Sequence, residues 1–159
     1  MDDLVRAAYD QARAAEAEGN LPIGSVVVKD GAVLGAGRNR QKSTGDPTTH
    51  AELEAIRDAV RRAGASDAAT LLAGATCVTT MMPCAMCAGA IIRFGLTGVI
   101  VAETTSYTHA GTAPFLERQG IRVEVQQDAD CIELVERYCR GHPHEAATMK
   151  FSGRKQLVV

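Results

Sequence analysis

Residues 75–103, ATCVTTMMPCAMCAGAIIRFGLTGVIVAE, change pattern twice, and these changes decide the fold class. The β-branched stretch at 75–82 predicts a strand, and 83–94 predicts a helix with Pro83 at a permitted first-turn position. Residues 97–103 are almost continuously apolar, which is typical of a strand buried on both faces. A strand, a helix and a second, buried strand in succession indicate an α/β protein.

The rest of the chain continues this alternation of helices and strands. The other predicted elements, in chain order, are a helix at 3–18 capped by Asp2 or Asp3, two strands joined by the Asp30-Gly31 turn, a loop at 38–48, a helix at 49–63, a short helix at 112–120, a strand at 121–126 and a helix at 128–140. The sequence therefore predicts an α/β fold in which helices sandwich a five-stranded mixed sheet. A chain of 159 residues suits one core, so we expect a single domain over 1–159.

Composition and charge narrow the class of protein. Hydrophobic residues make up 46% and charged residues 23% of the chain, which is ordinary for a globular protein. The N-terminal MDDLVRAAYD is acidic and no long apolar run follows, so we expect a cytoplasmic protein without a membrane span. The net charge of −2 makes nucleic acid an unfavoured partner. In a cytoplasmic chain the five cysteines are expected to be reduced.

Cys84 and Cys87, in PCAMC, form a C-x-x-C pair that fits a redox pair, a structural zinc site or a working metal site. His50 begins the predicted helix 49–63, which one strand separates from the cysteine helix, so both helix starts are expected near neighbouring strand ends. One histidine and two cysteines supply three zinc ligands and leave a fourth position for water, which is the catalytic arrangement. We therefore expect one Zn²⁺ per chain, held by His50, Cys84 and Cys87.

Glu52 lies two residues after His50 and is not needed as a ligand. A carboxylate beside a zinc-bound water can accept the proton of that water and deliver it to a leaving amine, so Glu52 is the candidate catalytic residue. The same THAE segment also fits a helix-capping box, with Thr49 as the N-cap and Glu52 reaching back. The other cysteines, Cys77, Cys131 and Cys139, are expected to be small buried apolar residues. His142 and His144 are expected to cap the last helix or to be solvated, and His109 to lie on the surface.

With these residues in view, the sequence resembles the cytidine/cytosine deaminase superfamily from about residue 4 to about residue 140. The segments that carry the resemblance are LPIGSVVV (21–28), GRNR (37–40), DPTTHAE (46–52) and PCAMCAGAI (83–91). The chain is most similar to fungal-type cytosine deaminases and is also similar to guanine deaminases and tRNA adenosine deaminases. The resemblance implies a cytidine deaminase-like three-layer α/β/α fold and a hydrolase acting on C–N bonds in cyclic amidines.

The resemblance also implies further site residues and a homodimer with the zinc site near the subunit interface. Asn39 would bind the substrate ring, and the backbone N–H of Ala51 would bind a ring oxygen. Tyr107 stands where the family has an aromatic lid residue. Met82 replaces a small polar residue next to the substrate, and the tail from about residue 141 is expected to cover or border the site.

The expected substrate is a free, flat heterocycle with an exocyclic amine or imine. Cytosine comes first, followed by guanine, creatinine or another aminated ring. One alternative is a tRNA adenosine deaminase, in which basic residues would contact phosphates: Arg38, Arg40, Lys42 and Arg93. Another alternative, from a different class, is a non-catalytic zinc-stabilised binding protein.

Overall fold

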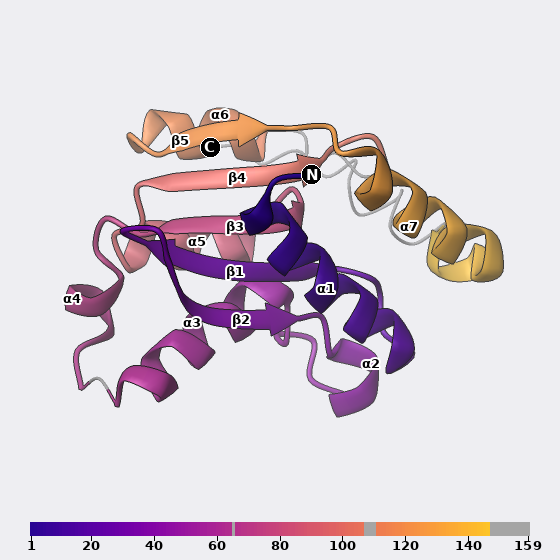
Figure 1. Cartoon of the computed structure of the whole chain (residues 1–159), viewed down its shortest axis with the longest axis horizontal. Helices are drawn as coiled ribbons and strands as arrows, with labels where there is room; N and C mark the ends of the chain where they lie inside the picture. The colour runs from indigo at the N-terminus through magenta and orange to yellow at the C-terminus, as the bar shows by residue number, and fades with distance from the viewer. Residues whose placement is uncertain (65, 107–110, 147–159) are drawn as a thin grey trace.

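A computed structural model describes residues 1–64, 66–106 and 111–146, and its strands form one mixed sheet in the order β2-β1-β3-β4-β5 (Figure 1). The strands are β1 (Gly24–Lys29), β2 (Ala32–Arg38), β3 (Thr76–Met81), β4 (Gly98–Glu103) and β5 (Arg122–Val125). β1 is antiparallel to β2 and β3, whereas β3, β4 and β5 run parallel to one another. This sheet confirms the predicted five-stranded mixed arrangement.

Helices cover both faces of the sheet and give three layers. The helices are α1 (Asp3–Ala17), α2 (Gln41–Thr44), α3 (Ala51–Ala63), α4 (Ala68–Leu72), α5 (Ala85–Arg93), α6 (Thr112–Arg118) and α7 (Ala129–Gly141). Successive strand residues point to opposite faces, so Val26 packs with α1 and Val27 packs with α3. Within the described ranges, every helix is too short or too polar to cross a membrane.

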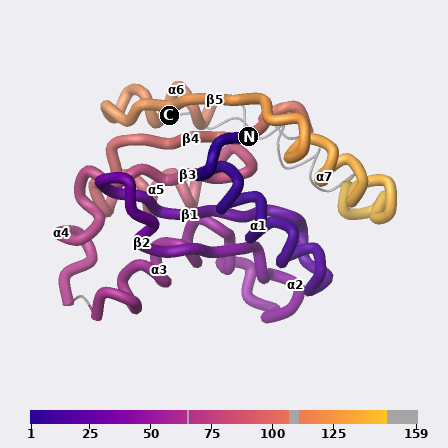
Figure 2. The backbone as a smooth tube through the Cα atoms, viewed as in Figure 1, coloured from indigo at the N-terminus to yellow at the C-terminus, as the bar shows by residue number. Residues whose placement is uncertain are grey.

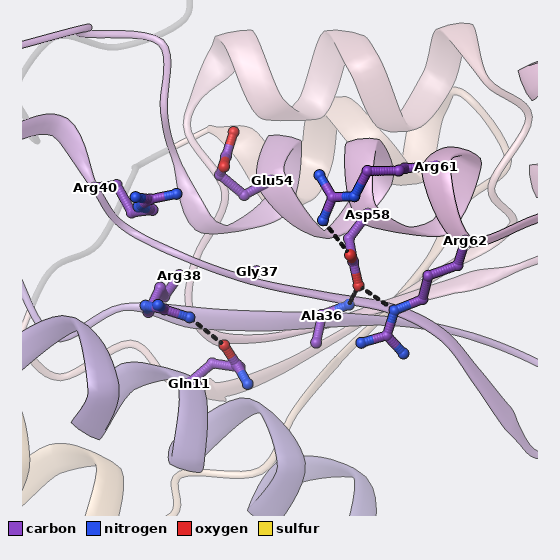
Figure 3. A pocket seen from close by; sticks show the side chains of 9 residues that line it. All are labelled: Gln11, Ala36, Gly37, Arg38, Arg40, Glu54, Asp58, Arg61 and Arg62. Carbon is purple, nitrogen blue, oxygen red and sulfur yellow. Dashed lines mark hydrogen bonds and ion pairs between the residues drawn. The ribbon is translucent and has the colours of Figure 1, made fainter. Parts of the chain in front are cut away.

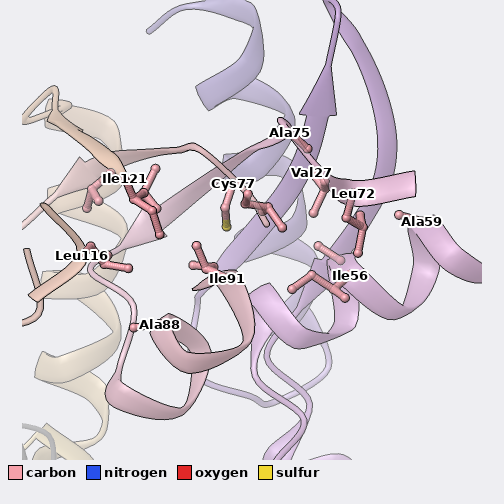
Figure 4. Packing of buried hydrophobic residues seen from close by; sticks show 14 of the residues in the cluster. Val27, Ile56, Ala59, Leu72, Ala75, Cys77, Ala88, Ile91, Leu116 and Ile121 are labelled. Carbon is pink, nitrogen blue, oxygen red and sulfur yellow. The ribbon is translucent and has the colours of Figure 1, made fainter. Parts of the chain in front are cut away.

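The larger core cluster fills the space between the sheet and the helices α3, α5 and α6 (Figure 4). Its buried members include Val27, Ile56, Cys77, Ile91 and Leu116. Small and branched aliphatic side chains dominate this cluster, as a chain with 4% aromatic residues requires. The cluster fixes α3 and α5 on the same face of the sheet, which confirms the predicted neighbourhood of the two ligand-bearing helices.

Two short helices and one proline differ from the predictions. α2 lies inside the segment predicted as a loop (Figure 2). The Asn20 side chain accepts hydrogen bonds from Lys42 N and Ser43 N, each at 3.0 Å, and so takes the place of a local capping residue. α4, at Ala68–Leu72, was not predicted. Pro83 was predicted in the first turn of α5 and instead precedes its N-cap, because Cys84 has an extended backbone with φ −75° and ψ 172°.

β2 and α3 are in backbone-to-backbone contact at Gly35 and Gly37. A Cβ atom at Gly35 would lie 2.3 Å from Ala59 N and 2.4 Å from Ala55 O. A Cβ atom at Gly37 would lie 2.4 Å from Ala51 O, in the first turn of α3. Glycine is therefore required here because the helix rests directly on the strand, and this contact sets the position of the start of α3.

We expect Gly35→Ala to lower the free energy of unfolding by about 2 kcal/mol or more, because the added methyl group meets helix backbone that cannot rotate away. Urea unfolding of the purified protein measures this loss. Gly141→Ala is the matched control, since a Cβ atom there has nothing within 4 Å and alanine is the better helix former at the end of α7, which favours a gain of up to about 1 kcal/mol. An unchanged unfolding midpoint in Gly35→Ala would contradict the close contact.

Candidate metal centre

The candidate ligands stand at the starts of two helices. His50 is the N-cap of α3 and Cys84 is the N-cap of α5, and both have an extended backbone. An N-cap side chain usually accepts a hydrogen bond from its own helix, but neither of these side chains does so. Both side chains are thus free to turn towards each other, and Cys87 in the first turn of α5 completes the group.

The three ligand atoms form a triangle whose edges fit zinc. His50 Nδ1 lies 3.6 Å from Cys84 Sγ and 3.7 Å from Cys87 Sγ, and the two sulfur atoms are 3.7 Å apart. A tetrahedral zinc with Zn–S of about 2.3 Å and Zn–N of about 2.05 Å needs N···S edges of about 3.6 Å and S···S edges of about 3.8 Å. In the described part of the chain the cluster contains three ligand residues, which would leave a tetrahedral ion one further position.

Glu52 is the acidic neighbour of this triangle. Its side chain is buried, and Oε2 lies 3.4 Å from Cys87 Sγ. Burial and, next, the negative charge of Cys84 raise the pKa of the Glu52 carboxyl above its ordinary value. The carboxyl therefore holds a proton more readily than an exposed glutamate, which suits a group that receives and returns protons.

The capping-box interpretation of residues 49–52 is wrong. The N-cap of α3 is His50 rather than Thr49, and it makes no side-chain capping bond. The Thr49 hydroxyl instead donates to the Asp46 carbonyl at 2.8 Å and lies 3.1 Å from the Thr44 hydroxyl. Glu52 points to Cys87 and does not close a capping box. The segment that precedes His50 is stabilised instead by hydrogen bonds within the loop.

The ligands influence one another's protonation. Hydrogen bonding with Cys87, and then with His50, lowers the pKa of the Cys84 thiol to about 3 despite its partial burial. The hydrogen bond with Cys84 and burial raise the pKa of Cys87, and the hydrogen bond with Cys84 raises the pKa of His50. Thiols bind zinc in their deprotonated form, so zinc binding would release a proton from Cys87, whose pKa is raised.

Asn39 lies at the end of β2 and is connected to the ligand segment through its neighbour. Its side chain is 2% exposed, and its amide bonds twice to Gln41: Nδ2 donates to Gln41 Oε1 at 2.9 Å, and Oδ1 accepts from Gln41 N at 3.2 Å. The next residue, Arg40, donates its backbone N–H to the Thr49 carbonyl at 3.0 Å. The structure thus brings the Asn39 segment alongside the residue that precedes His50.

The remaining predicted site residues have different surroundings. Ala51 is the first residue of α3, where a backbone N–H has no partner within the helix. Met82 is 6% exposed and packs in the larger core cluster. Tyr107 lies outside the described residues, as do His109 and the tail from residue 147 onward. The substrate roles of Asn39, Ala51, Met82 and Tyr107 therefore stay predictions.

The other histidines and cysteines are accounted for in the described ranges. Cys77 and Cys131 are buried as expected, and Cys139 is half-buried beside Met81 and Val135. His142 is the C-cap of α7, and its ring stacks on Tyr138 with centroids 4.1 Å apart. The expectation that His142 caps the last helix is confirmed.

Glu145, which follows α7, makes a contact that was not predicted from the sequence. Glu145 accepts a hydrogen bond from the Tyr138 hydroxyl, and its Oε1 is 2.8 Å from Lys42 Nζ on α2. No local motif at Glu145 predicts this contact, because Tyr138 is seven residues away in sequence and Lys42 is 103 residues away.

A mixed sheet that carries a three-ligand zinc site at two helix starts defines the class of zinc-binding deaminases. Residues 1–103 match the family model for the cytidine and deoxycytidylate deaminase zinc-binding region. The chain is 31% identical over 142 residues to the cytosine deaminase of Candida albicans, covering 89% of this chain and 90% of that one. The chain belongs to the cytidine and deoxycytidylate deaminase family.

Two further relatives broaden the range of substrates in this family. The chain is 32% identical over 97 residues to a tRNA-specific adenosine deaminase of Aquifex aeolicus, covering 61% of this chain and 62% of that one. The solved structure of a guanine deaminase from Nitrosomonas europaea superposes with a TM-score of 0.73 at 25% identity, over 85% of this chain and 82% of that one. The predicted family resemblance and fold are confirmed.

We expect Cys84→Ala to weaken zinc binding by more than about 100-fold, because loss of a direct ligand exceeds the 10–100-fold effect of losing a residue that only supports one. Metal analysis of the purified protein after dialysis against a weak chelator measures the loss. Cys139→Ala is the control, since it removes a thiol outside the triangle. Full zinc content in Cys84→Ala would refute the ligand set.

Proposed function

We propose that the chain is a zinc-dependent hydrolytic deaminase that releases ammonia from a free aminated heterocycle, with cytosine as the first candidate. The observation that carries this proposal is the pairing of an open three-ligand triangle with a buried carboxyl that lies next to it. A zinc-stabilised binding protein has no use for a buried carboxyl with a raised pKa, because burying such a group costs stability. The site thus favours an enzyme over a non-catalytic protein.

In this proposal His50, Cys84 and Cys87 would hold the zinc ion, which would supply a water molecule of lowered pKa, about 7. Glu52 accepts the proton of that water and transfers it to a ring nitrogen of the substrate. The oxygen adds to the carbon that bears the amine, and Glu52 takes the second proton and gives it to the leaving amine. Ammonia leaves, and a carbonyl replaces the amine on the ring.

Asn39 and Ala51 are proposed to orient the ring. An amide side chain has two N–H donors and about two acceptor positions on its oxygen. Gln41 uses one of each, so Asn39 retains one donor and one acceptor for the edge of a heterocycle. The N–H of Ala51, at the positive end of α3, suits a ring oxygen. Met82 and Tyr107 stay candidates for the walls of the pocket.

Cytosine is placed first because the cytosine deaminase of Candida albicans is 31% identical over 89% of this chain. A tRNA-specific adenosine deaminase of Streptococcus pyogenes is 29% identical over 86% of this chain, so the extent of the match does not separate the two substrates. The net charge of −2 disfavours a tRNA substrate. Guanine is the second candidate, and creatinine or another aminated ring follows.

A cytoplasmic homodimer with one zinc per chain completes the proposal. Helix α5 begins at the ligand Cys84 and contains the ligand Cys87. On its outer face Met86 is exposed, and a Cβ atom at Gly89 would have no neighbour within 4 Å. A second chain on this face would lie beside the metal centre. A flexible, exposed methionine beside small residues allows another chain to pack closely against the helix, which supports an interface there.

We expect zinc-loaded protein to release ammonia from cytosine and Glu52→Gln to do so at least about 10²-fold more slowly, because proton transfer by a positioned group contributes about 10²–10⁴-fold. An ammonia assay over cytosine, guanine, creatinine and a tRNA anticodon stem-loop measures both rate and substrate class. Glu133→Gln makes the same change on the exposed face of α7 and should leave the rate unaltered.

The controls separate the reaction from the choice of substrate. Turnover in Glu52→Gln at the rate of the unaltered protein would refute the proton-transfer role. Release from guanine and none from cytosine would keep the deaminase assignment and correct the substrate. No release from any of the four, with zinc bound, would leave the zinc-stabilised binding protein as the better interpretation.

A further inference from the structure

A groove of about 230 Å³ lies over β2, the strand at the edge of the sheet, between α1 and α3 (Figure 3). Four arginines and two acidic residues supply the charges that line it: Arg38, Arg40, Glu54, Asp58, Arg61 and Arg62. The four residues from α3 lie at positions i, i+4, i+7 and i+8, so they share one face of that helix. No part of the metal triangle lines this groove.

The groove and the metal centre use different faces of α3. Glu52 and Glu54 are two residues apart, which is a rotation of about 200° around an α-helix. Glu52 points to Cys87 and is buried, whereas Glu54 lines the groove. A ligand in the groove would therefore be a second ligand, separate from the proposed deaminase substrate.

Asp58 sits between two arginines and cannot neutralise both. Its Oδ1 pairs with Arg61 at 2.5 Å, and its Oδ2 pairs with Arg62 at 2.7 Å. Oδ2 also accepts the backbone N–H of Ala36 at 3.0 Å, which fixes the carboxylate against the edge of β2. One carboxylate shared by two guanidinium groups leaves one positive charge in the groove.

Arg40 adds a second positive charge, near Glu18, the carboxylate that already pairs with Arg38. Its side chain is exposed, and its guanidinium makes no hydrogen bond or ion pair with another residue of the described ranges. Arg38, in contrast, is held by both oxygens of Glu18, at 3.1 and 2.5 Å. Glu54 is paired with Arg57 at 2.6 Å, so its charge is already offset. The groove is positive in a chain whose net charge is −2.

We propose that this groove binds a phosphate group. The planar fork of arginine matches phosphate oxygens with two parallel hydrogen bonds, and several arginines around one anion are the usual arrangement for phosphate. The volume of about 230 Å³ is below the range of about 300–1,000 Å³ typical of pockets that enclose a whole small molecule. The groove would therefore hold the phosphate, while the rest of its carrier stays outside.

Helix stabilisation does not explain the whole cluster. Arg61 and Arg62 lie in the last turn of α3, where positive charge is favourable in any helix. Arg40 precedes α3 and has no such role. Its charge lies beside the same groove (Figure 3), so a feature outside the helix has to account for it.

Binding of inorganic phosphate to the zinc-loaded full chain, followed by NMR of the arginine Nε–H signals, tests the proposal without reference to deaminase activity. We expect saturable shifts at the groove arginines, which weaken as NaCl rises. R40Q should weaken phosphate binding by about tenfold or more, because a hydrogen bond to a charged group contributes about 1.5–3 kcal/mol. Since Arg40 makes no ion pair in the described ranges, R40Q should keep its melting temperature.

R137Q is the matched control, because Arg137 pairs with Glu16 at 2.8 Å, outside the groove, and carries the same charge. Uridine 5′-monophosphate and a single-stranded oligothymidine, titrated in parallel, distinguish a free phosphate, a nucleotide and a nucleic-acid backbone as the source. Tighter binding of one of these with the same R40Q effect would identify the carrier. Absence of saturable binding at millimolar phosphate, or equal weakening in R137Q, would overturn the proposal.

Discussion

Three ligand atoms on two separate helices have to come within about 4 Å of one another, and the rest of this structure serves that requirement. Zinc tolerates errors of only a few tenths of an ångström in its ligand distances. The start of α5 is set by β3, which pairs with β1 and β4 on either side. The start of α3 is set by the glycine contacts with β2. The positions of β2 and β3 in the sheet therefore fix the metal triangle.

The placement of the ligands at two helix starts also affects the electrostatics of the site. Two thiolates and a carboxylate in one buried place would repel one another, and each would lose hydration on burial. The N-termini of α3 and α5 both meet the cluster, and the partial positive charge at a helix start stabilises anions there. Hydrogen bonding with Cys87, and then with His50, lowers the pKa of Cys84 although it is partly buried. For Glu52 the largest influence on the carboxyl is burial, which raises its pKa.

The features that follow from local patterns were predictable from the sequence. The five strands and the long helices were predicted because their periodicity, caps and turns lie within each segment, and the ligand triangle followed from two helix starts. α2 and α4 have four and five residues, which is too short for a helical hydrophobic periodicity to be recognised in the sequence. α2 depends on Asn20, which lies more than twenty residues earlier. Such contacts across the chain cannot be inferred from a local motif.

The capping-box error at residues 49–52 has the same origin. The THAE segment has the composition of a capping box, but Cys87 attracts Glu52, and Cys87 comes from another helix. The Asn39 amide instead stays within its own turn, where two hydrogen bonds to Gln41 leave one donor and one acceptor available. For Glu52 the partner on another helix, rather than the local motif, decides what the side chain does.

α3 joins the two sites, and Arg40 links the groove to the segment that precedes His50. Its backbone N–H holds the Thr49 carbonyl, and its guanidinium lies at the groove. A ligand regulates a distant site only when it favours one of two arrangements of the element between them. The segment from Arg40 to Thr49 is held in one arrangement by bonds among Thr44, Asp46 and Thr49. On this geometry a phosphate in the groove would anchor its carrier beside the enzyme and leave the ligand triangle unchanged.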